Sequence, residues 1–313
     1  MKALSTRDAF GEAIVEIASD NENVYVIDCD ISKSMKTTKF AQTFPERHIN
    51  VGIAEQNAVG VAAGLATMGK IPFVSTYAVF ASMRACEQIR TSVCYSALNV
   101  KFACSHGGLT PGNDGVTHQA IEDMGIMRTI PNMTIIMGAD YVSTKKLIKK
   151  STEIEGPVYL RFTRDPVPVF YKDEDEFEIG KGKLLKKGRD ITIISLGEML
   201  HEALKAADRL EHQGIGVELI DIHTLKPLDV DLISQSISKT GKVITVEDHN
   251  IINGLGSAVA EVIAEMGFGH LRRVGLKDTF AESGEYHLLL KKYEMDCSYI
   301  CKMAEELLGI ELG

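Results

Sequence analysis

The sequence predicts an α/β protein of two tandem domains, each with a mostly parallel sheet covered by helices on both faces. Three observations support this prediction. The 313 residues are enough for about two domains of roughly 150 residues each. Short runs rich in β-branched residues alternate with longer segments of helical period, which is typical of parallel sheets connected by helices. The alternation breaks once, near residues 165–190, and then restarts.

The first domain is expected over residues 1–165. A helix of mostly small residues is predicted over 54–69, where Gly60 and Gly64 allow close approach to the surface on which the helix packs, at some cost in helix propensity. The strands of this domain are predicted at residues 24–28, 71–75, 100–104, 133–137 and 158–162.

A linker is expected over residues 166–189, because prolines interrupt the pattern and the charged run at 172–176 has no apolar face. The second domain, residues 190–313, restarts the alternation. Its strands are predicted at residues 191–195, 216–220, 243–246 and 271–274. Its helices are predicted at 199–212, at 257–266 and in a last segment that ends near residue 308.

The composition excludes several classes of protein. With 45% hydrophobic and 25% charged residues, the chain is neither disordered nor fibrous. The 34 basic and 43 acidic residues leave a net charge of −9, so no cationic face for nucleic acid is expected. The N-terminus lacks the apolar core of a signal peptide, and charges interrupt every apolar stretch well short of the ~18 residues of a membrane span. We expect a soluble, cytoplasmic protein without nucleic-acid or membrane partners.

The six cysteines show no CxxC spacing, which fits a reducing compartment. Cys297 and Cys301 lie four residues apart, but no second Cys or His pair follows them, so no metal site is predicted there. The chain also lacks a GxxxxGK[ST] motif, and the glycine cluster at 253–257 lacks the third glycine of a dinucleotide fingerprint. Nucleotide binding by either of those routes is not expected.

The loops that follow predicted strands are the first candidates for chemistry, since ligands of open parallel sheets bind beyond the carboxyl ends of the strands. The glycine-rich segment 105–119 places His106, Asp114 and His118 in one polar loop. A single histidine is more often structural, but two histidines and an aspartate together favour a site. Glu55 opens the predicted helix 54–69, where a functional acid and simple stabilisation of the helix N-terminus are equally consistent with the spacing.

Two further positions stay open on the residues alone. Tyr77 and Phe80 lie three apart at a strand-to-helix turn, where aromatic side chains form a pocket wall or, more commonly, part of the core. Arg164 follows the last strand of the first domain. There it is placed to bind a phosphate or carboxylate, and equally to pair with the adjacent Asp165.

Taken together, these segments resemble the transketolase family. The first domain resembles the family's pyrimidine-binding domain through VGIAEQN at 51–57, STYAVF at 75–80, the loop from His106 to His118, and Arg164. The second domain, with VEDH at 246–249 ahead of GLG at 254–256, resembles the family's C-terminal domain. The resemblance spans nearly the whole chain but only the C-terminal half of a full-length transketolase.

The resemblance implies thiamine diphosphate chemistry, in which the protein supplies orientation and electrostatics. Glu55 matches the family's glutamate at N1′ of the aminopyrimidine. A proton shared there favours the tautomer that can take a proton from the thiazolium. This role asks for an apolar, poorly hydrated place, which the uncharged helix behind Glu55 suits. Phe80 matches the aromatic that packs on the pyrimidine, Tyr77 belongs to the same wall, and Asp30 lies where the family has an acid near the cofactor. Met83 lies where many relatives carry tyrosine and is given no role.

The resemblance also implies substrate contacts, for a two-carbon ketol transfer between sugar phosphates. His106, Asp114 and His118 match contacts to sugar hydroxyls and to the substrate carbonyl, and His118 is expected to act in catalysis. The positions that hold the sugar phosphate in the family are matched by Arg7, Ser34, His106 and Arg164.

In the family, a Gly-Asp-Gly motif with a downstream Asn binds the diphosphate through a divalent metal, and both lie in the N-terminal half. Here residues 113–115 and Asn132 imitate that motif poorly, because the first glycine is absent and the gap is short. We therefore expect no metal ligand in this chain. The resemblance implies an N-terminal transketolase subunit that holds the Mg²⁺ and the diphosphate, in an α2β2 assembly.

Three alternatives remain open. The first is the beta subunit of a 2-oxo-acid dehydrogenase-type decarboxylase, whose substrates lack a sugar phosphate. The second is deoxyxylulose-phosphate synthase, which shares the Gly-Ile-Ala-Glu-Gln segment but typically has an arginine where His106 stands. The third is a non-catalytic paralogue that binds a partner, which is expected to lack Glu55.

Overall fold

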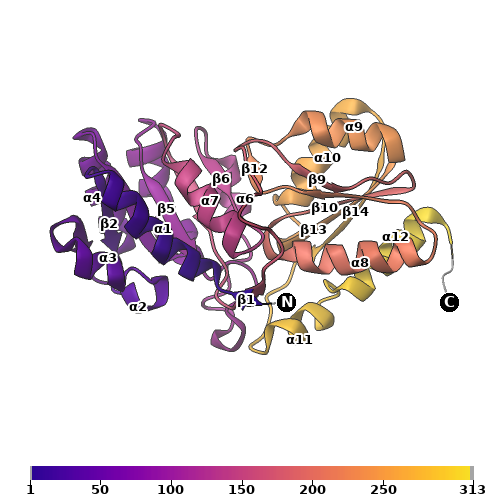
Figure 1. The fold of residues 1–313 in the computed structure, drawn as a ribbon, viewed down its shortest axis with the longest axis horizontal. Helices are drawn as coiled ribbons and strands as arrows, with labels where there is room; N and C mark the ends of the chain where they lie inside the picture. Colours follow the sequence, from indigo (N-terminus) through magenta and orange to yellow (C-terminus); the bar gives the residue numbers. More distant parts are fainter. Residues whose placement is uncertain (1, 311–313) are drawn as a thin grey trace.

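The computed structural model describes residues 2–310 and contains two parallel-dominated sheets in tandem (Figure 1). The larger sheet has seven strands in the order β12-β6-β7-β5-β4-β2-β3, and its strands from the first domain all run parallel. These strands are β2 (Val24–Asp28), β3 (His48–Asn50), β4 (Ile71–Tyr77), β5 (Lys101–Ser105), β6 (Thr134–Ile136) and β7 (Val158–Arg161). All five strands predicted for this domain are confirmed, and the short edge strand β3 was not predicted.

Helices cover both faces of this sheet. Side chains of α1 and α7 belong to one apolar cluster, whereas those of α4, α6 and two π-helical segments belong to another. The helices are α1 (Thr6–Asp20), α2 (Ser32–Met35), α3 (Thr38–Thr43), α4 (Glu55–Thr67), α5 (Cys86–Gln88), α6 (Asp123–Thr129) and α7 (Tyr141–Ser151), and the π-helical segments are Phe80–Arg84 and Ile89–Cys94.

Helix α4 confirms the helix predicted over 54–69, but its glycines act differently from the prediction. Small side chains such as Ala58 and Ala62 pack it against the sheet. Gly60 and Gly64 lie on the opposite, open face, where an added Cβ would meet nothing within 4 Å. The two glycines therefore give no close approach within this chain.

The second sheet has five strands in the order β14-β13-β10-β11-β9, parallel except for the antiparallel edge strand β9. Helices α8 and α12 lie on one face and α9 and α10 on the other (Figure 1). The strands are β9 (Lys183–Lys186), β10 (Ile191–Ser195), β11 (Val217–Asp221), β13 (Lys242–Asn250) and β14 (His270–Leu276). The helices are α8 (Leu200–His212), α9 (Val230–Thr240), α10 (Leu255–Met266), α11 (Tyr286–Lys292) and α12 (Cys297–Leu308). All four strands and all three helices predicted here are confirmed.

The segment expected as a linker is more structured than its composition indicates. Most of the charged run 172–176 is exposed, as expected. Tyr171 and Phe177 on either side of that run are buried, however, and β9 lies within the segment. Upstream, β8 (Val167–Pro168) pairs antiparallel with β1 (Ala3–Leu4). Apolar residues at the ends of the charged run thus anchor it to the core.

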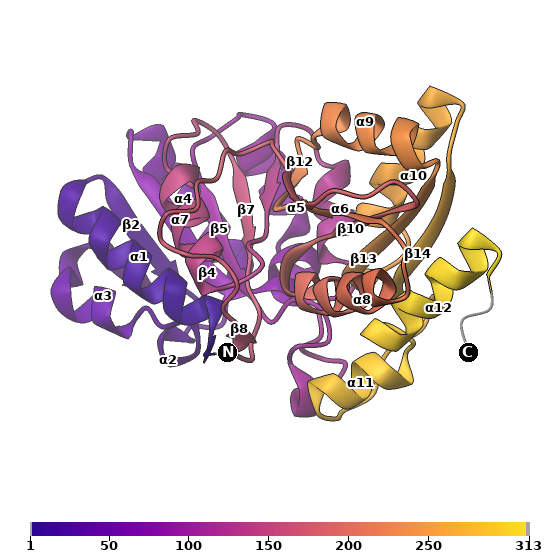
Figure 2. The same cartoon turned by 45° about the vertical axis from the view of Figure 1, so that its right-hand side comes forward.

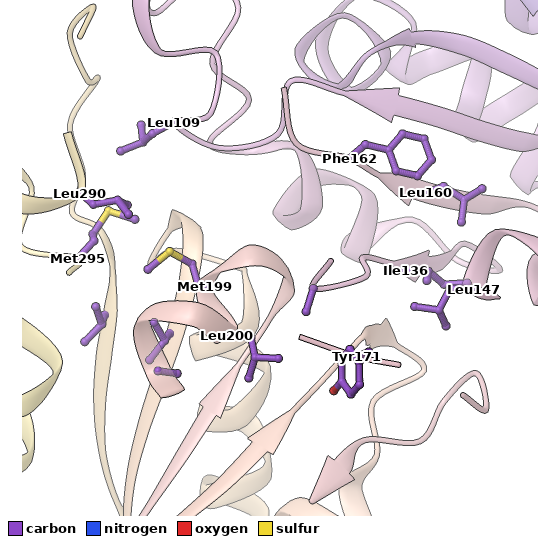
Figure 3. Close-up of a cluster of buried hydrophobic side chains, with 14 of the residues drawn as sticks. Leu109, Ile136, Leu147, Leu160, Phe162, Tyr171, Met199, Leu200, Leu290 and Met295 are labelled. Carbon is purple, nitrogen blue, oxygen red and sulfur yellow. The ribbon is translucent and has the colours of Figure 1, made fainter. Parts of the chain in front are cut away.

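Several contacts join the two domains. Strand β12 (Thr224–Lys226) comes from the second domain and pairs antiparallel with β6, so it completes the larger sheet. One apolar cluster contains side chains of both domains, such as Leu109 and Phe162 from the first and Met199 and Leu290 from the second (Figure 3). Strand pairing and core packing therefore both tie the domains together.

Two general features complete the description. Among residues 2–310, the structure contains no helix with the length and apolar character that a bilayer crossing requires. The six cysteines, all within the described range, are free thiols.

Candidate active site

The residues predicted for the site come from segments that follow β2, β4, β5 and β7, at the carboxyl edge of the larger sheet. Ser34 lies in α2 after β2, and Tyr77 ends β4. His106 follows β5 directly, and Arg164 follows β7. Because parallel strands end at the same edge, residues far apart in the sequence meet there. Helix α1 adds Arg7 from its first turn.

Four rings form a continuous aromatic group. The ring centroids of Tyr77 and His106 lie 3.8 Å apart. His118 packs edge-on against both Tyr77 and Phe80, with 5.7 Å between centroids in each pair. Tyr77 and Phe80 thus pack in one group with both histidines of the glycine-rich loop.

Arg7 ties three of these segments together. Its Nη1 donates to the carbonyl oxygen of Ser34 at 2.8 Å and to Ser34 Oγ at 2.9 Å, and its Nη2 donates to the carbonyl oxygen of Arg164 at 2.7 Å. The Tyr77 hydroxyl donates to Ser34 Oγ at 3.0 Å. Burial and the nearby Arg164 lower the pKa of Arg7 from its usual value. Arg7, Ser34 and Arg164 therefore lie in one cluster with the aromatic group.

His106, Asp114 and Arg164 form the polar end of the cluster. His106 is buried, has a φ of 65°, and packs its ring against that of Tyr77. Burial and the cations of Arg7 and Arg164 lower the pKa of His106 to about 3. Arg164 Nε lies 3.0 Å from Asp114 Oδ2, and Arg164 Nη1 donates to Asp165 at 3.0 Å. The pairing with Asp165 that was considered for Arg164 is thus present, and Arg164 also pairs with Asp114, while its binding of a phosphate or carboxylate ligand stays a prediction.

The second domain holds the glycine-rich loop in place. The amide of Leu109 donates to both carboxylate oxygens of Asp248 at 2.9 Å. Gly108 has a φ of +61°, and a Cβ there would lie 2.1 Å from the Asp248 carboxyl carbon. Beyond this point the loop reaches the segment that precedes α11, where the amide of Gly284 donates to the carbonyl oxygen of Gly112 at 3.3 Å (Figure 2). The VEDH segment therefore supplies the carboxylate that fixes the loop.

Glu55 begins α4 and is only 2% exposed. Its Oε2 accepts a hydrogen bond from Arg84 Nη1 at 2.7 Å, and the Arg84 guanidinium lies 4.3 Å from the centre of the Phe80 ring. The expected burial is confirmed, and the helix behind Glu55 carries no other charge, but Arg84 from a neighbouring segment supplies a counter-charge that was not predicted. The π-helical segment Phe80–Arg84 places that side chain, and π-bulges are frequent at functional sites.

Arg84 was not predicted from the sequence, although a signal for it exists. Between Lys70 and Glu87 it is the only charged residue, and it lies four positions after Phe80. A buried carboxylate without a partner is costly, so a lone charge in an apolar segment is a natural candidate for that partner.

Asp30 lies at the margin of the site. It is exposed, has a φ of 66°, and accepts a hydrogen bond from Asn50 Nδ2 at 3.1 Å. With Ser34 and Tyr77 it lines a depression of about 430 Å³. A second depression of about 700 Å³, around Phe177 and Lys183, contains none of the predicted site residues. We therefore take the sheet edge, where the predicted residues gather, as the candidate site.

The arrangement combines two kinds of chemistry. A buried carboxylate beside an aromatic face suits a planar heteroaromatic ring that carries a basic nitrogen. The adjoining arginines, histidines and hydroxyls suit an anionic molecule rich in hydroxyl groups. The residues present thus fit a cofactor with an aminopyrimidine ring and a substrate with a phosphate.

Comparison with known proteins gives the same picture. Residues 2–169 match the model of the transketolase pyrimidine-binding domain, and residues 180–300 match that of the transketolase C-terminal domain. A putative transketolase C-terminal section from Methanocaldococcus jannaschii is 48% identical over 303 residues, which cover 96% of this chain and 95% of that protein.

Two further relatives are named as subunits. A 6-deoxy-6-sulfo-D-fructose transketolase subunit from Clostridium sp. (strain MSTE9) is 41% identical over 301 residues, covering 96% of this chain and 94% of the relative. An apulose-4-phosphate transketolase subunit from Phocaeicola vulgatus is 36% identical over 304 residues, covering 97% of each chain.

Solved structures show the same fold. One described as a split gene transketolase, inactive beta4 tetramer, has a TM-score of 0.90 at 46% identity and covers 99% of this chain and 100% of its own. The transketolase of Campylobacter jejuni has a TM-score of 0.83 at 23% identity, which shows the fold alone, and this chain covers 47% of that longer protein.

Proposed function

This chain belongs to the transketolase family, and we propose that it is the C-terminal subunit of a split, thiamine diphosphate-dependent transketolase that transfers a two-carbon ketol unit between sugar phosphates. The observation that carries the proposal is the buried Glu55 carboxylate beside Phe80, next to a cluster of arginine, histidine and hydroxyl groups. The chain also spans nearly the full length of relatives that are themselves named as sections or subunits.

The cofactor half of the site consists of Glu55, Phe80, Tyr77 and, at its margin, Asp30. Thiamine diphosphate, when bound, supplies the reactive carbon that accepts the ketol unit. Glu55 shares a proton with N1′ of the aminopyrimidine. Its low exposure keeps water from competing for that proton. Phe80 and Tyr77 orient the ring by packing.

The substrate half consists of the cationic and polar cluster. Arg7, Ser34 and Arg164 bind the sugar phosphate, and the Arg7 contacts to Ser34 and to the Arg164 carbonyl hold these groups at one point. His106 contributes a hydrogen bond to the same region. Asp114 and His118 bind the sugar hydroxyls and the carbonyl, and His118 moves a proton at the substrate oxygen.

The proposal includes a partner. An N-terminal transketolase subunit holds Mg²⁺ and the diphosphate, and two copies of each chain form an α2β2 assembly in the cytoplasm. The open face of α4 supports a contact with another chain. It carries Gly60 and Gly64, and Met68 and Ile53 at its ends are 75% and 74% exposed. Such apolar exposure beside small residues is typical of an interface.

The proposal is tested by reconstitution. The isolated chain is expected to show no ketol transfer and no tight calorimetric binding of thiamine diphosphate, and adding the N-terminal subunit is expected to restore both. Ketol transfer by the lone chain at full rate would contradict the split-enzyme assignment. A panel of phosphorylated and sulfonated sugars belongs in the assay, because the relatives are named for different sugars.

The Glu55→Gln variant tests the proton-sharing role within the reconstituted complex. We expect turnover to fall by about 10²-fold or more, the usual range for a lost acid–base group, while cofactor binding persists. Unchanged activity would remove Glu55 from the mechanism.

A further inference from the structure

Ser105 lies directly beneath the site and has no role in the function proposed above. It ends β5 and is completely buried. Its Oγ lies 2.8 Å from His106 Nδ1 and 2.8 Å from Met35 Sδ. On the other side of the imidazole ring, His106 Nε2 lies 3.9 Å from Asp114 Oδ2.

The hydroxyl has only one proton for its two neighbours. A thioether sulfur carries no proton and accepts hydrogen bonds weakly, whereas an imidazole nitrogen is a good donor or acceptor. Two arrangements therefore exist. In the first, Ser105 donates to Met35 and accepts from a protonated Nδ1 of His106. In the second, Ser105 donates to an unprotonated Nδ1, and the proton of His106 lies on Nε2.

The surroundings of His106 favour the second arrangement. The first would point the Nε2 lone pair at the Asp114 carboxylate, whereas the second points an N–H at it. The second also gives the Ser105 proton to the stronger acceptor, at the expense of the weak hydrogen bond from Ser105 to Met35 Sδ. A doubly protonated ring is disfavoured because burial and the cations of Arg7 and Arg164 lower the pKa of His106 to about 3.

We propose that Ser105 is a positioning residue that donates to His106 Nδ1 and thereby fixes His106 as a neutral imidazole whose Nε2–H points into the substrate cluster. In the proposed enzyme, His106 is then a hydrogen-bond donor to a substrate oxygen rather than a cation or a base. The identity of that oxygen rests on the proposed function, whereas the tautomer is a property of the chain itself.

The tautomer is measured directly by long-range ¹H–¹⁵N spectra of the full chain labelled at histidine. His106 is assigned from the signals that disappear in His106→Gln. We expect the proton on Nε2 and an imine-type shift at Nδ1. A proton on Nδ1 in the wild-type chain would overturn the proposal.

Three variants test whether Ser105 sets this tautomer. Ser105→Ala is expected to shift His106 towards a mixture of tautomers, and Ser105→Thr, which keeps the hydroxyl, to restore the wild-type pattern. Ser151→Ala removes another fully buried hydroxyl, which donates to Ile148 O at 2.6 Å in α7, and is expected to leave the His106 signals unchanged. An unchanged tautomer in a folded Ser105→Ala chain would refute the role of Ser105.

The reconstituted enzyme gives a second readout, which does not need a folded Ser105→Ala chain. The amide nitrogen of Gln reaches the Nε2 position of histidine, whereas that of Asn lies closer to Nδ1. His106→Gln is therefore expected to retain about tenfold more kcat/KM than His106→Asn, the equivalent of one hydrogen bond. Equal or reversed activities would contradict the proposal. If the wild-type complex transfers no ketol units while the spectra show the Nε2 proton, the proposed function fails and the tautomer assignment stands.

Discussion

At the scale of single residues, the buried carboxylate of Glu55 is paired with the guanidinium of Arg84. Glu55 is almost inaccessible, whereas the Arg84 side chain is 46% exposed, so the arginine brings its charge to the carboxylate from the surface. The same guanidinium covers the Phe80 ring. A residue that looks like a surface arginine in the sequence therefore contributes to the environment of the candidate acid.

The Arg84→Met variant tests this pair. We expect it to lower the free energy of unfolding by about 2–3 kcal/mol, because it leaves a buried carboxylate without its partner. Arg90→Met, in the next π-helical segment, is the matched control and is expected to have little effect. Urea unfolding at pH 7 measures both. In the double variant Glu55→Gln/Arg84→Met, the buried charge is gone, so the stability lost in Arg84→Met should be partly recovered. If it is not recovered, the loss of the Glu55–Arg84 pair is not the cause of the destabilisation.

Asp221 provides a pH-dependent contribution to stability. It is completely buried, and Tyr171 donates to its Oδ2 at 2.6 Å, while its Oδ1 has no partner among the described residues. Burial raises the pKa of Asp221 to about 7. Between about pH 4 and pH 7, the native state therefore keeps a proton on Asp221 that the unfolded chain has released. This group stabilises the fold at low pH, and that stability is lost as the pH rises through about 7.

The Asp221→Asn variant tests this linkage. At pH 4 we expect it to match the wild type, and at pH 8 to be more stable by about 4 kcal/mol, because the amide needs no charge in the core. Urea unfolding at the two pH values measures the difference. The exposed Asp231→Asn is the control. A stability difference that does not change with pH would show that Asp221 is charged throughout.

At the scale of elements, glycines have different structural roles in the glycine-rich loop and in α4. In the loop, Gly108 lets the backbone lie against Asp248 of the second domain. In α4, Gly60 and Gly64 leave a shallow open face instead. One pattern of glycines thus serves contact within the chain, and the other is available for contact between chains.

Gly108→Ala tests the loop contact. The added Cβ would overlap the Asp248 carboxylate at a positive φ, so we expect a loss of about 2–4 kcal/mol in the free energy of unfolding. Gly69 has a similar φ of +77°, and an added Cβ there would meet nothing within 4 Å. Gly69→Ala is therefore the control, because it measures the cost of the backbone conformation without a steric clash. Equal losses in the two variants would mean that the Asp248 contact does not constrain the loop.

At the scale of the whole molecule, the two domains share a buried ionic centre. Arg161 Nε donates to Asp123 Oδ2 at 2.9 Å, and Nη2 donates to the carbonyl oxygens of Ala120 at 2.8 Å and Asp248 at 3.0 Å. Both side chains of the ion pair have no exposure. Together with the shared apolar cluster, this centre predicts that the chain unfolds in one transition rather than domain by domain.

Arg161→Met tests that centre. Because it leaves Asp123 buried without its partner, we expect a loss of about 3–5 kcal/mol. The double variant Arg161→Met/Asp123→Leu is expected to recover part of the loss. Urea unfolding followed by fluorescence and by circular dichroism measures stability and shows whether the two signals coincide. Separate transitions in the wild type would show that the domains unfold independently.

Local pattern was sufficient for most of the fold. All nine predicted strands are present, because buried strands of parallel sheets are short β-branched runs. The strands β1, β3, β8, β9 and β12 were missed, because each has only two to four residues and is defined by its pairing partner. For the site, the family resemblance pointed to Arg7, Ser34, Tyr77 and His106, while Arg84 and Ser105 emerged only from their contacts.

The succession of strands and helices, the family and the residue types at the sheet edge could be read from the amino-acid sequence, because each depends on neighbouring positions in the chain. The folded chain was needed to show that Arg84 pairs with Glu55, that Asp248 holds the loop at Leu109, and that Ser105 lies against His106 Nδ1. Buried charges and hydrogen bonds act over a few ångströms, and which groups come that close is set by packing across the whole chain.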